Sequence, residues 1–507
     1  MPRKIATPMA PSSVPDMPER TRHNGLSLIL AFDVGTSYLK AAIFDRGGST
    51  VARADMQYTT VMPSPGRVEQ APDEWLDLMC AAVRQMRNGG IDTGLVVGIG
   101  LSARGANTIF LDDAGEVLTP CWLDHRCAPA ARQLAVILGR DIDYQTRRMA
   151  SHTYHLRTEH PDLFDRLAHP LFAKDFVLFR LTGRLATDPS SGPPEGIWPA
   201  DLWNVVGVPI ERLPPVFPHT TVAGTLLPSM ADRLGLPPGI PVGVGGHDGA
   251  CANTGAGAIV AGQCCLTLGT QGVARTITDR VPPDARDRRV SPYHFLPGRW
   301  CCSGDLIKAG AIPTLTARTL LGDEVPLAQA HAKLTHAAQP VAPGSGGVTY
   351  LPFPGGEICP DLRLDARAAY LGMSTDTGRA ELYRATLEGT AYAFRSAVER
   401  HREVGLTVDD IRLSGGGAAN MLWVRILSDV LQSPMTVVAP DEGTRGAAMF
   451  LATGLGWFAS VEDAAAAWVR TVEVIPPGPD SAIYDVLYRR FRHLADAVYE
   501  AERTVPA

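Results

Sequence analysis

Lysine is scarce in this sequence of 507 residues. Only five lysines occur, against 42 arginines, and none of the five follows a glycine. The glycine-lysine dipeptide of a Walker-type P-loop is therefore absent. A net charge of −6 also lacks the basic surplus that is typical of nucleic-acid binding. We expect no nucleic-acid partner, and any nucleotide must be held by a different motif.

Other common features are missing as well. The nine cysteines form no C-x-x-C or paired zinc spacing, no secretory leader is apparent, and no apolar run approaches the ~20 residues of a membrane span. These absences predict a cytoplasmic protein with reduced thiols and no membrane partner.

A histidine-rich segment, SHTYHLRTEH, contains His152, His155 and His160. Three histidines close together are compatible with a metal site. However, no cysteine or carboxylate stands at ligand spacing on the same short element, so metal binding is disfavoured here.

The chain is too long for one hydrophobic core and should divide into two or three domains. Residues 1–25 are rich in proline and serine and predict a disordered tail. The stretch LSLILAFDVGTSYLKAAIFDRGGSTVARA predicts three successive strands, and QCCLTLGTQGVARTIT repeats the strand, Gly-Thr turn and strand. We interpret the repetition as a duplicated α/β domain, joined near 255–262.

Further elements follow from local patterns. DEWLDLMCAAVRQMR, KDFVLFRLTG and residues 379–402 predict helices, as does the segment from about Asn420. LVVGIGLS, PVGVGG and IRLSGGG predict strands that run into loops.

The most unusual stretch is GVGGHDGACANTGAGA at 243–258, where glycines surround His247 and Asp248. Glycine lets the backbone approach a ligand closely, so the stretch is able to leave room for a substrate beside a carboxylate. The alternative is a tight turn in which the aspartate only caps a helix.

Four ordered motifs resemble the FGGY family of carbohydrate kinases over about residues 27–475. AAYLGMSTDTGRAELYRATLE (368–388) is similar to the family's carboxyl-half signature, and YLPFPGGEICP precedes it. LSGGGAAN (413–420) and RGAAMFLATGLG (445–456) resemble the adenosine-binding part.

The resemblance implies an α/β fold of two duplicated actin-like (ribonuclease H-like) domains with an interdomain cleft. We expect an N-terminal kinase domain at 26–258 for sugar and phosphate, a C-terminal domain at 259–475 for the nucleotide, and a terminal helix and tail at 476–507. ATP and Mg²⁺ are the implied cofactors and a small sugar is the implied partner; a homodimer is left open.

Turns that expose backbone amides predict the phosphate grip. Gly35, Thr36 and Ser37 follow the first strand, and Gly269 and Thr270 occupy the matching turn in the second half. Oriented amides in such turns form an anion nest. Asp33 ends the strand beside the first nest, where a carboxylate is able to hold Mg²⁺ directly or through water. A plain hairpin is the alternative for each turn alone.

The glycine-rich loop LSGGGAAN predicts the adenosine site. Gly416 and Gly417 let a flat ring approach the backbone, and Asn420 supplies a polar contact. The alternative is a simple strand-to-helix turn.

The sugar side is predicted from two segments. Arg104 follows a buried strand in SARGAN, and Asp124 lies in CWLDHR, similar to a family W-x-D-x-R segment. Structural salt bridges would explain Arg104, Asp124 and Arg126 equally well, and bracing of the cleft is one interpretation of Glu357. The family's amino-half signature, with its lysine and tryptophan, is missing near 150–165, which leaves the substrate less determined than the reaction.

We therefore predict ATP-dependent phosphorylation of a terminal hydroxyl, with Asp248 as catalytic base and sugar contact and His247 as the rival base. A ketopentose such as xylulose is the expected substrate; a polyol such as glycerol or erythritol and a deoxy-ketohexose are alternatives. A non-catalytic sugar sensor and an actin-like ATPase that moves a partner protein are the other classes.

Overall fold

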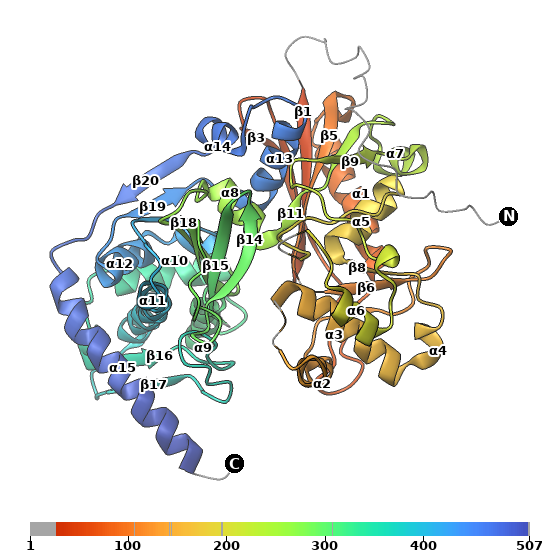
Figure 1. The fold of residues 1–507 in the computed structure, drawn as a ribbon. Helices are drawn as coiled ribbons and strands as arrows, with labels where there is room; N and C mark the ends of the chain where they lie inside the picture. Colours follow the sequence, from red (N-terminus) through yellow and green to blue (C-terminus); the bar gives the residue numbers. More distant parts are fainter. Residues whose placement is uncertain are drawn as a thin grey trace. The chain divides into compact units, whose positions relative to one another are not determined.

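The computed structural model describes residues 27–504 except 106, 141, 143, 194–195 and 307, so the predicted tail at 1–25 lies outside the described residues. The chain forms two compact units. The first contains Met1–Gly255, Tyr293–Leu296 and Asp441–Trp468; the second contains Ala256–Pro292, Pro297–Pro440 and Val469–Ala507. Figure 1 colours both along the sequence. The return of Asp441–Trp468 to the first unit was not anticipated from the sequence.

A seven-stranded sheet forms the centre of the first unit. Its order is β3-β2-β1-β5-β10-β9, and β11 also pairs with β5. β1, β2 and β3 are an antiparallel meander, as predicted, whereas β5 lies parallel to β1. The strands are β1 (Leu28–Val34), β2 (Tyr38–Phe44), β3 (Thr50–Gln57), β5 (Val96–Ala103), β9 (Val222–Thr225), β10 (Pro241–Gly243) and β11 (Gly246–His247).

Helices and two small sheets complete the first unit. α13 packs against β1 and β5, and α1 packs against β2 and β3, so apolar strand residues are buried in a continuous core. The small sheets are β4 (Glu69–Gln70) with β7 (Cys121–Trp122) and β6 (Thr108–Leu111) with β8 (His169–Phe172). The helices are α1 (Pro72–Asn88), α2 (Ala128–Leu138), α3 (Tyr144–Glu159), α4 (Pro161–Phe164), α5 (Ala173–Thr182), α6 (Ala200–Val206), α7 (Pro228–Leu234), α8 (Asp248–Ala256), α13 (Glu442–Gly454) and α14 (Val461–Trp468), with 3-10 turns at Thr93–Leu95 and Ile210–Arg212.

The second unit repeats the strand pattern of the first. Its sheet runs β15-β13-β12-β18-β19-β20. β12, β13 and β15 are antiparallel, β18 and β19 are parallel to β12, and β20 is antiparallel at the edge. The first sheet has the same sequence of directions, which confirms the predicted duplication. The strands are β12 (Gln263–Leu268), β13 (Gly272–Thr278), β15 (Arg299–Leu306), β18 (Asp410–Ser414), β19 (Met435–Val438) and β20 (Thr471–Ile475); β14 (Ser291–Leu296) is divided between the units.

The long helix α11 forms the core of the second unit. Its apolar residues pack against β13, β15 and α12, and Figure 1 shows the ribbon of α11 close to those of α12 and β15. The remaining elements are β16 (Thr349–Leu351), β17 (Ala369–Leu371), α9 (Ala311–Leu321), α10 (Leu327–Ala338), α11 (Arg379–Glu403), α12 (Met421–Leu431) and α15 (Ser481–Thr504), with 3-10 turns at Ser345–Gly347 and Gly416–Ala419.

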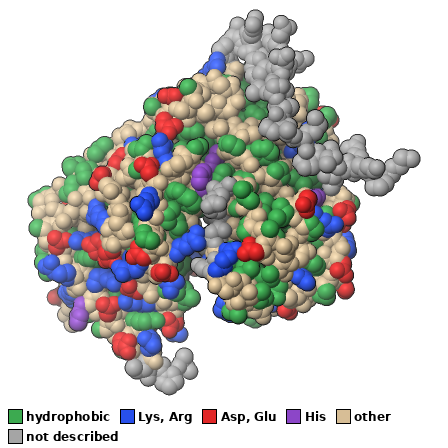
Figure 2. Space-filling view, in the orientation of Figure 1, with side chains coloured by type: hydrophobic (Ala, Val, Ile, Leu, Met, Phe, Trp, Pro, Cys, Tyr) green, Lys and Arg blue, Asp and Glu red, His purple; other side chains and the backbone are tan. Residues whose placement is uncertain are grey.

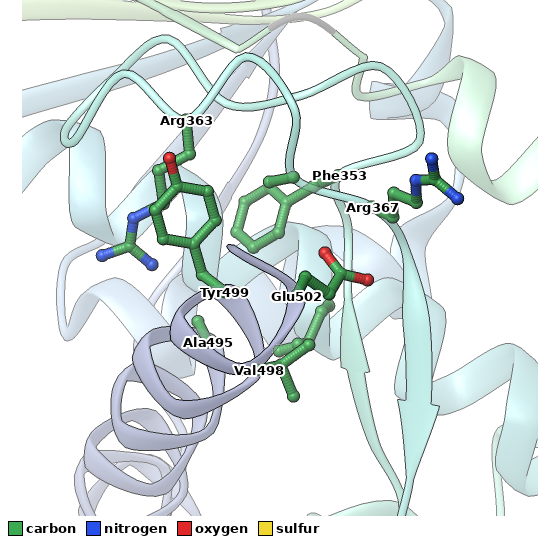
Figure 3. A pocket seen from close by; sticks show the side chains of 9 residues that line it. Phe353, Arg363, Arg367, Ala495, Val498, Tyr499 and Glu502 are labelled. Atoms are coloured by element: carbon green, nitrogen blue, oxygen red, sulfur yellow. The ribbon is translucent and has the colours of Figure 1, made fainter. Parts of the chain in front are cut away.

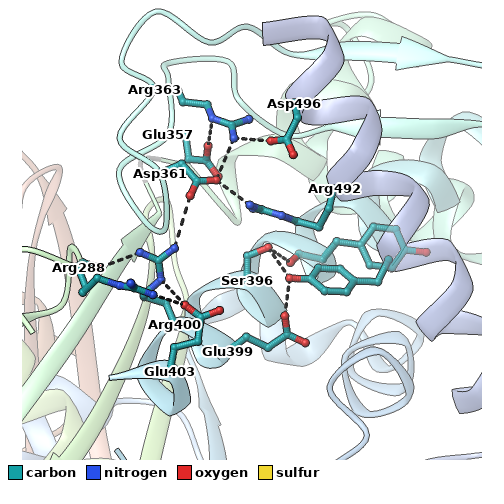
Figure 4. A network of polar contacts seen from close by, with 12 residues as sticks. Arg288, Glu357, Asp361, Arg363, Ser396, Glu399, Arg400, Glu403, Arg492 and Asp496 are labelled. Carbon is teal, nitrogen blue, oxygen red and sulfur yellow. Dashed lines mark hydrogen bonds and ion pairs between the residues drawn. The ribbon is translucent and has the colours of Figure 1, made fainter. Parts of the chain in front are cut away.

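The C-terminal helix α15 is held by apolar and ionic contacts. Figure 3 shows Phe353 and Tyr499 at a small pocket beside α15, with Arg363 Cζ 5.0 Å from the centre of the Tyr499 ring. Figure 4 shows the adjoining network, in which Asp361 Oδ2 accepts from Arg492 at 2.7 Å. The face of the second unit in Figure 2 also carries interspersed acidic and basic side chains. Ion pairs therefore supplement the apolar packing of α15.

Candidate active site

The first Gly-Thr turn connects β1 to β2. Gly35 N–H donates to Tyr38 O at 3.1 Å and closes the turn. Thr36 and Ser37 are exposed at its tip. The predicted turn between two strands is present, but the Gly35 amide that was expected to face a phosphate donates within the turn instead, and Thr36 and Ser37 are the exposed residues.

Arg104 supports this turn from inside the protein. Its guanidinium donates to Gly35 O, to Gln70 Oε1 at 2.9 Å and to Asn107 Oδ1 at 3.0 Å, while Gln70 Nε2 donates to Thr36 O at 3.0 Å. Only 4% of Arg104 is exposed. Because Nε and both terminal nitrogens already donate to protein acceptors, the geometry favours the structural alternative for Arg104 over a sugar contact.

Asp124 is occupied in the same way. Its carboxylate accepts from Arg126 Nε at 2.9 Å, from Arg126 Nη2 at 2.5 Å and from Val68 N–H at 2.8 Å. Burial alone would raise the pKa of Asp124, but the bonds from Arg126 and Val68 hold it well below its ordinary value. Arg126 also bonds Glu69 at 2.7 Å. The structural alternative is favoured for this ion pair too.

Asp33 lies near the end of β1. Its Oδ1 accepts from Ser102 Oγ at 2.7 Å, and Ser102 is its register partner on β5. On the other side, α13 begins so close that a Cβ on Gly443 would lie 2.8 Å from Oδ2. The carboxylate is thus held between the carboxyl ends of β1 and β5 and the start of α13, a helix from much later in the sequence.

The electrostatics of Asp33 are dominated by burial, which raises its pKa to about 6. Lys40, its register partner on β2, lowers that pKa, whereas the negative charges of Asp248 and Glu442 raise it. These carboxylates therefore repel one another at the carboxyl ends of β1 and β11, and a cation at this edge would relieve the repulsion.

Asp248 is the first residue of α8, directly after β11, which pairs in parallel with β5. Its Oδ1 accepts from Gly249 N–H at 2.7 Å and lies 3.0 Å from His247 Nε2. His247 Nδ1 accepts from Gly249 N–H at 3.2 Å, which leaves the ring proton of a neutral imidazole on Nε2, the nitrogen nearer Asp248. The Asp248 side chain is 38% exposed and that of His247 is 14% exposed. Asp248 therefore combines a bond from the next backbone amide with an accessible carboxylate.

The glycines before and after Asp248 serve the packing of the protein. Gly245 has φ +69°, and a Cβ there would lie 1.9 Å from Leu101 O. A Cβ on Gly255 would lie 1.8 Å from Glu442 O. The expectation that the glycines leave room for a substrate is wrong at these two positions, because the protein's own backbone fills that space. The positive φ also ends β10 at Gly243, so the predicted strand PVGVGG is split into β10 and β11.

The second Gly-Thr turn lies in the other unit, between β12 and β13. Gly269 O accepts from Gly310 N–H at 2.7 Å, and Thr270 is exposed. A Cβ on Gly415 would lie 2.9 Å from the carbonyl carbon of Leu268. The turn and the glycine-rich loop after β18 are therefore in close contact within this unit.

In that loop the three predicted residues differ. A Cβ on Gly416 would meet nothing within 4 Å, whereas one on Gly417 would lie 2.6 Å from Trp423 Cζ3. Asn420 caps α12: its Oδ1 accepts from Trp423 N–H at 3.3 Å, and its Nδ2 donates to Thr335 Oγ1 at 3.1 Å. Gly416 leaves open space beside the backbone, while Gly417 and Asn420 also have packing and capping roles.

The histidine-rich segment forms part of α3 and packs on an aromatic ring. The rings of His152, His155 and His160 lie 5.5–6.2 Å from that of Trp122. Burial lowers the pKa of His152 to about 3. Over the residues that the structure describes, no group of three or more His, Cys, Asp or Glu residues is suited to a metal ion.

Several residues at the site were missed in the sequence. Ser102, Lys40 and Glu442 are brought to Asp33 by strand register and by the return of α13. A serine directly after the apolar run of β5 was a local signal for Ser102; nothing near Glu442 linked it to Asp33.

Comparison with known proteins agrees with this architecture. Residues 28–255 match the N-terminal domain of the FGGY family of carbohydrate kinases, and residues 254–455 match its C-terminal domain. A xylulose kinase of Bacillus subtilis is 25% identical over 93% of this chain and 98% of its own length. A gluconokinase of the same organism is 24% identical over 81% of this chain and 84% of its own. The crystal structure of xylulose kinase from Rhodospirillum rubrum aligns with a TM-score of 0.80 and 27% identity, over 93% of this chain and 99% of that one.

These matches define the chain as a carbohydrate kinase with a two-domain α/β fold of the actin-like type. It belongs to the FGGY family, and the family resemblance inferred from the motifs is confirmed. No helix within the described residues has the length and apolar character needed to cross a membrane.

Proposed function

We propose that the protein transfers the γ-phosphoryl group of ATP to a terminal hydroxyl of a small sugar, most favourably a ketopentose such as xylulose. The observation that carries this proposal is the pair of carboxylates, Asp33 and Asp248, beside the exposed Gly35–Ser37 turn in the first unit. Phosphoryl transfer needs a grip on the phosphates, neutralisation of their charge and an aligned acceptor hydroxyl.

Asp248 is the residue that receives the proton of the acceptor hydroxyl as its oxygen attacks the γ-phosphorus and ADP leaves. Its carboxylate is accessible, Gly249 N–H donates to Oδ1 at 2.7 Å, and His247 Nε2 lies 3.0 Å from the same oxygen. His247 itself is less suited as the base, because its Nδ1 already accepts from Gly249 N–H and its side chain is less exposed than that of Asp248. A carboxylate suffices as the base, since in a loose transition state the proton leaves late.

The carboxylates around Asp33 fit a magnesium ion. The negative charges of Asp248 and Glu442 repel that of Asp33, so a cation beside Asp33 would be stabilised. Carboxylate oxygens are also the ligands that Mg²⁺ prefers. Mg²⁺ usually keeps water and substrate phosphates as its other ligands, which agrees with a site that has few protein donors. Asp33 would hold the ion, directly or through water, and the ion would neutralise phosphate charge.

Candidate nucleotide contacts are assigned in each unit separately, to loops that expose backbone at a turn. Thr36 and Ser37 offer hydroxyls and amides to the phosphates, as does Thr270. The open space at Gly416 accepts the flat adenine or ribose against the backbone. Gly417 and Asn420 shape that loop through their contacts with Trp423.

The choice of ketopentose rests on similarity to xylulose kinases over nearly the whole chain. The gluconokinase relatives and the missing amino-half signature keep other acceptors in view. The test is ADP release measured with xylulose, ribulose, glycerol, erythritol, a deoxy-ketohexose and gluconate, with the phosphorylated product identified in each case. A kcat/KM for glycerol or erythritol well above that of every ketopentose would overturn the assignment of a ketopentose as the substrate. A sensor would release no ADP with any of them, and a motor-type ATPase would release ADP without a phosphosugar.

A pair of variants tests the base. Asp248→Asn keeps the shape and removes proton acceptance, so kcat should fall on the order of 10²–10⁴ with nucleotide binding retained. His247→Asn is the matched control and should cost much less. Near-normal kcat in Asp248→Asn with a large loss in His247→Asn would exchange the two roles.

A further inference from the structure

A buried polar cluster in the first unit contacts the segment that directly precedes Asp248, the proposed catalytic base. Lys174 and Asp175 come from the start of α5, and Asp188 and Ser190 come from the following loop. Exposure of these four residues is 2%, 0%, 0% and 0%. Fully buried charges are costly unless they are paired, so this cluster calls for an explanation beyond ordinary core packing.

Asp188 is the centre of the cluster. Its carboxylate lies 3.3 Å from Lys174 Nζ and accepts from Ser190 N–H at 2.8 Å, from the Ser190 hydroxyl, and from Ser191 Oγ at 2.7 Å. Burial would raise the pKa of Asp188, but Lys174, His219 and Ser190 lower it below its ordinary value. Asp188 is therefore an ionised acceptor whose oxygens are filled by directed donors.

Ser190 connects Asp188 to β11, the strand that directly precedes Asp248. Because its hydroxyl proton is given to Asp188, its lone pairs are left to accept, and Ser190 Oγ accepts from His247 N–H at 3.0 Å. This bond therefore anchors β11 one residue before Asp248.

His219 provides a second attachment of the same strand. Its Nε2 lies 3.3 Å from Asp188 Oδ1, and its carbonyl accepts from Gly245 N–H at 3.2 Å. A Cβ on Gly246 would lie 3.0 Å from His219 Cδ2, so the strand is pressed against this ring. His219 thus lies between Asp188 and the segment that leads into β11.

We infer that Ser190, oriented by Asp188, is a positioning residue that sets the direction in which Asp248 presents its carboxylate to the acceptor hydroxyl. This inference rests on the proposed function, since it assigns Ser190 an effect that passes through Asp248. Phosphoryl transfer depends strongly on alignment, so a small rotation of β11 should lower kcat without weakening nucleotide binding.

Ser190→Ala is the test, and Ser191→Ala is its matched control. Both variants delete one hydroxyl that donates to Asp188, but only Ser190 also accepts from His247. Ser190→Ala should lower kcat about 10-fold or more with the KM for ATP nearly unchanged, whereas Ser191→Ala should stay within about 3-fold. Ser190→Cys keeps the volume with a weaker acceptor and should fall between wild type and Ser190→Ala. Equal losses in both alanine variants would overturn the inference.

Hydrogen exchange of the His247 amide provides a readout that does not depend on activity. It should accelerate about 5-fold or more in Ser190→Ala and stay unchanged in Ser191→Ala, because only the first variant loses the acceptor. Unchanged exchange in Ser190→Ala contradicts the anchoring, and faster exchange with normal kcat contradicts its catalytic relevance.

A double-mutant cycle separates this inference from the proposed function. In an Asp248→Asn background, Ser190→Ala should change kcat by less than about 2-fold, because its effect passes through the missing carboxylate. A loss as large as in the wild-type background means that Ser190 acts elsewhere and overturns the inference. Normal kcat in Asp248→Asn alone refutes the base itself, and with it the catalytic part of the inference, whereas the exchange result still reports on the anchor.

Discussion

Glu357 makes the stability of the second unit depend on pH near neutrality. It is 4% exposed, and its Oε2 lies 3.5 Å from Arg363 Nε. Burial raises the pKa of Glu357 to about 7, and the attraction of Arg363 reduces the effect only in part. The perturbation that tests this is Glu357→Gln, which keeps the shape and removes the titration.

The sign follows from proton binding. In the folded protein Glu357 holds its proton up to about pH 7, while in the unfolded chain the proton leaves near 4.5. Between these values the folded state binds more protons, so the free energy of unfolding falls as pH rises. At 1.36 kcal/mol for each pH unit, the difference corresponds to at most about 3 kcal/mol at pH 8. Glu357→Gln should therefore resemble the wild type near pH 4.5 and be more stable than it at pH 8.

The assay is thermal unfolding of both proteins from pH 4.5 to 8. For a unit of roughly 200 residues, about 3 kcal/mol corresponds to a difference in Tm on the order of 6–12 °C at the upper end of the pH range. Glu403→Gln, which removes a half-exposed carboxylate of the same network, is the control and should differ from wild type by a nearly constant amount. A gap between Glu357→Gln and wild type that is constant or shrinks with rising pH would refute the reasoning.

Two further predictions concern the first unit. Asp33 has a pKa of about 6 and must be ionised to hold a cation, so kcat/KM should decline below pH 6. Asp33→Asn should also raise the Mg²⁺ concentration that gives half-maximal activity. A kcat/KM that stays constant down to pH 5 would contradict this role of Asp33. Gly446→Ala should destabilise the first unit by about 3 kcal/mol or more, because its Cβ would lie 1.9 Å from Cys251 O, whereas Gly416→Ala, in open space, should melt like the wild type and affect only nucleotide binding. Equal Tm values for the two alanine variants would show that α8 and α13 separate easily.

The sequence by itself determined the class of protein. The β1–β2 and β12–β13 hairpins, helix α5 with its Gly183 cap and α11 were predicted because alternation, helical spacing and glycine positions act over a few residues. The FGGY motifs are likewise contiguous segments, so family and reaction class followed from the order of residues alone.

The tertiary structure decided which polar residues serve packing. Arg104 and Asp124 looked equally suited to a sugar and to structural salt bridges, and Gln70 and Val68, which come from elsewhere in the chain, occupy part of their bonding capacity. Hydrogen-bond partners separated by tens of residues leave no local pattern.

The same holds for the surroundings of the two central aspartates. The return of 441–468 brings α13 against Asp33, and the loop after α5 brings Ser190 to the amide of His247. The glycines around Asp248 were visible in the sequence, but what filled the space they leave was not. Chain topology fixed those neighbours, because close backbone approach depends on segments that meet only when the whole unit has folded.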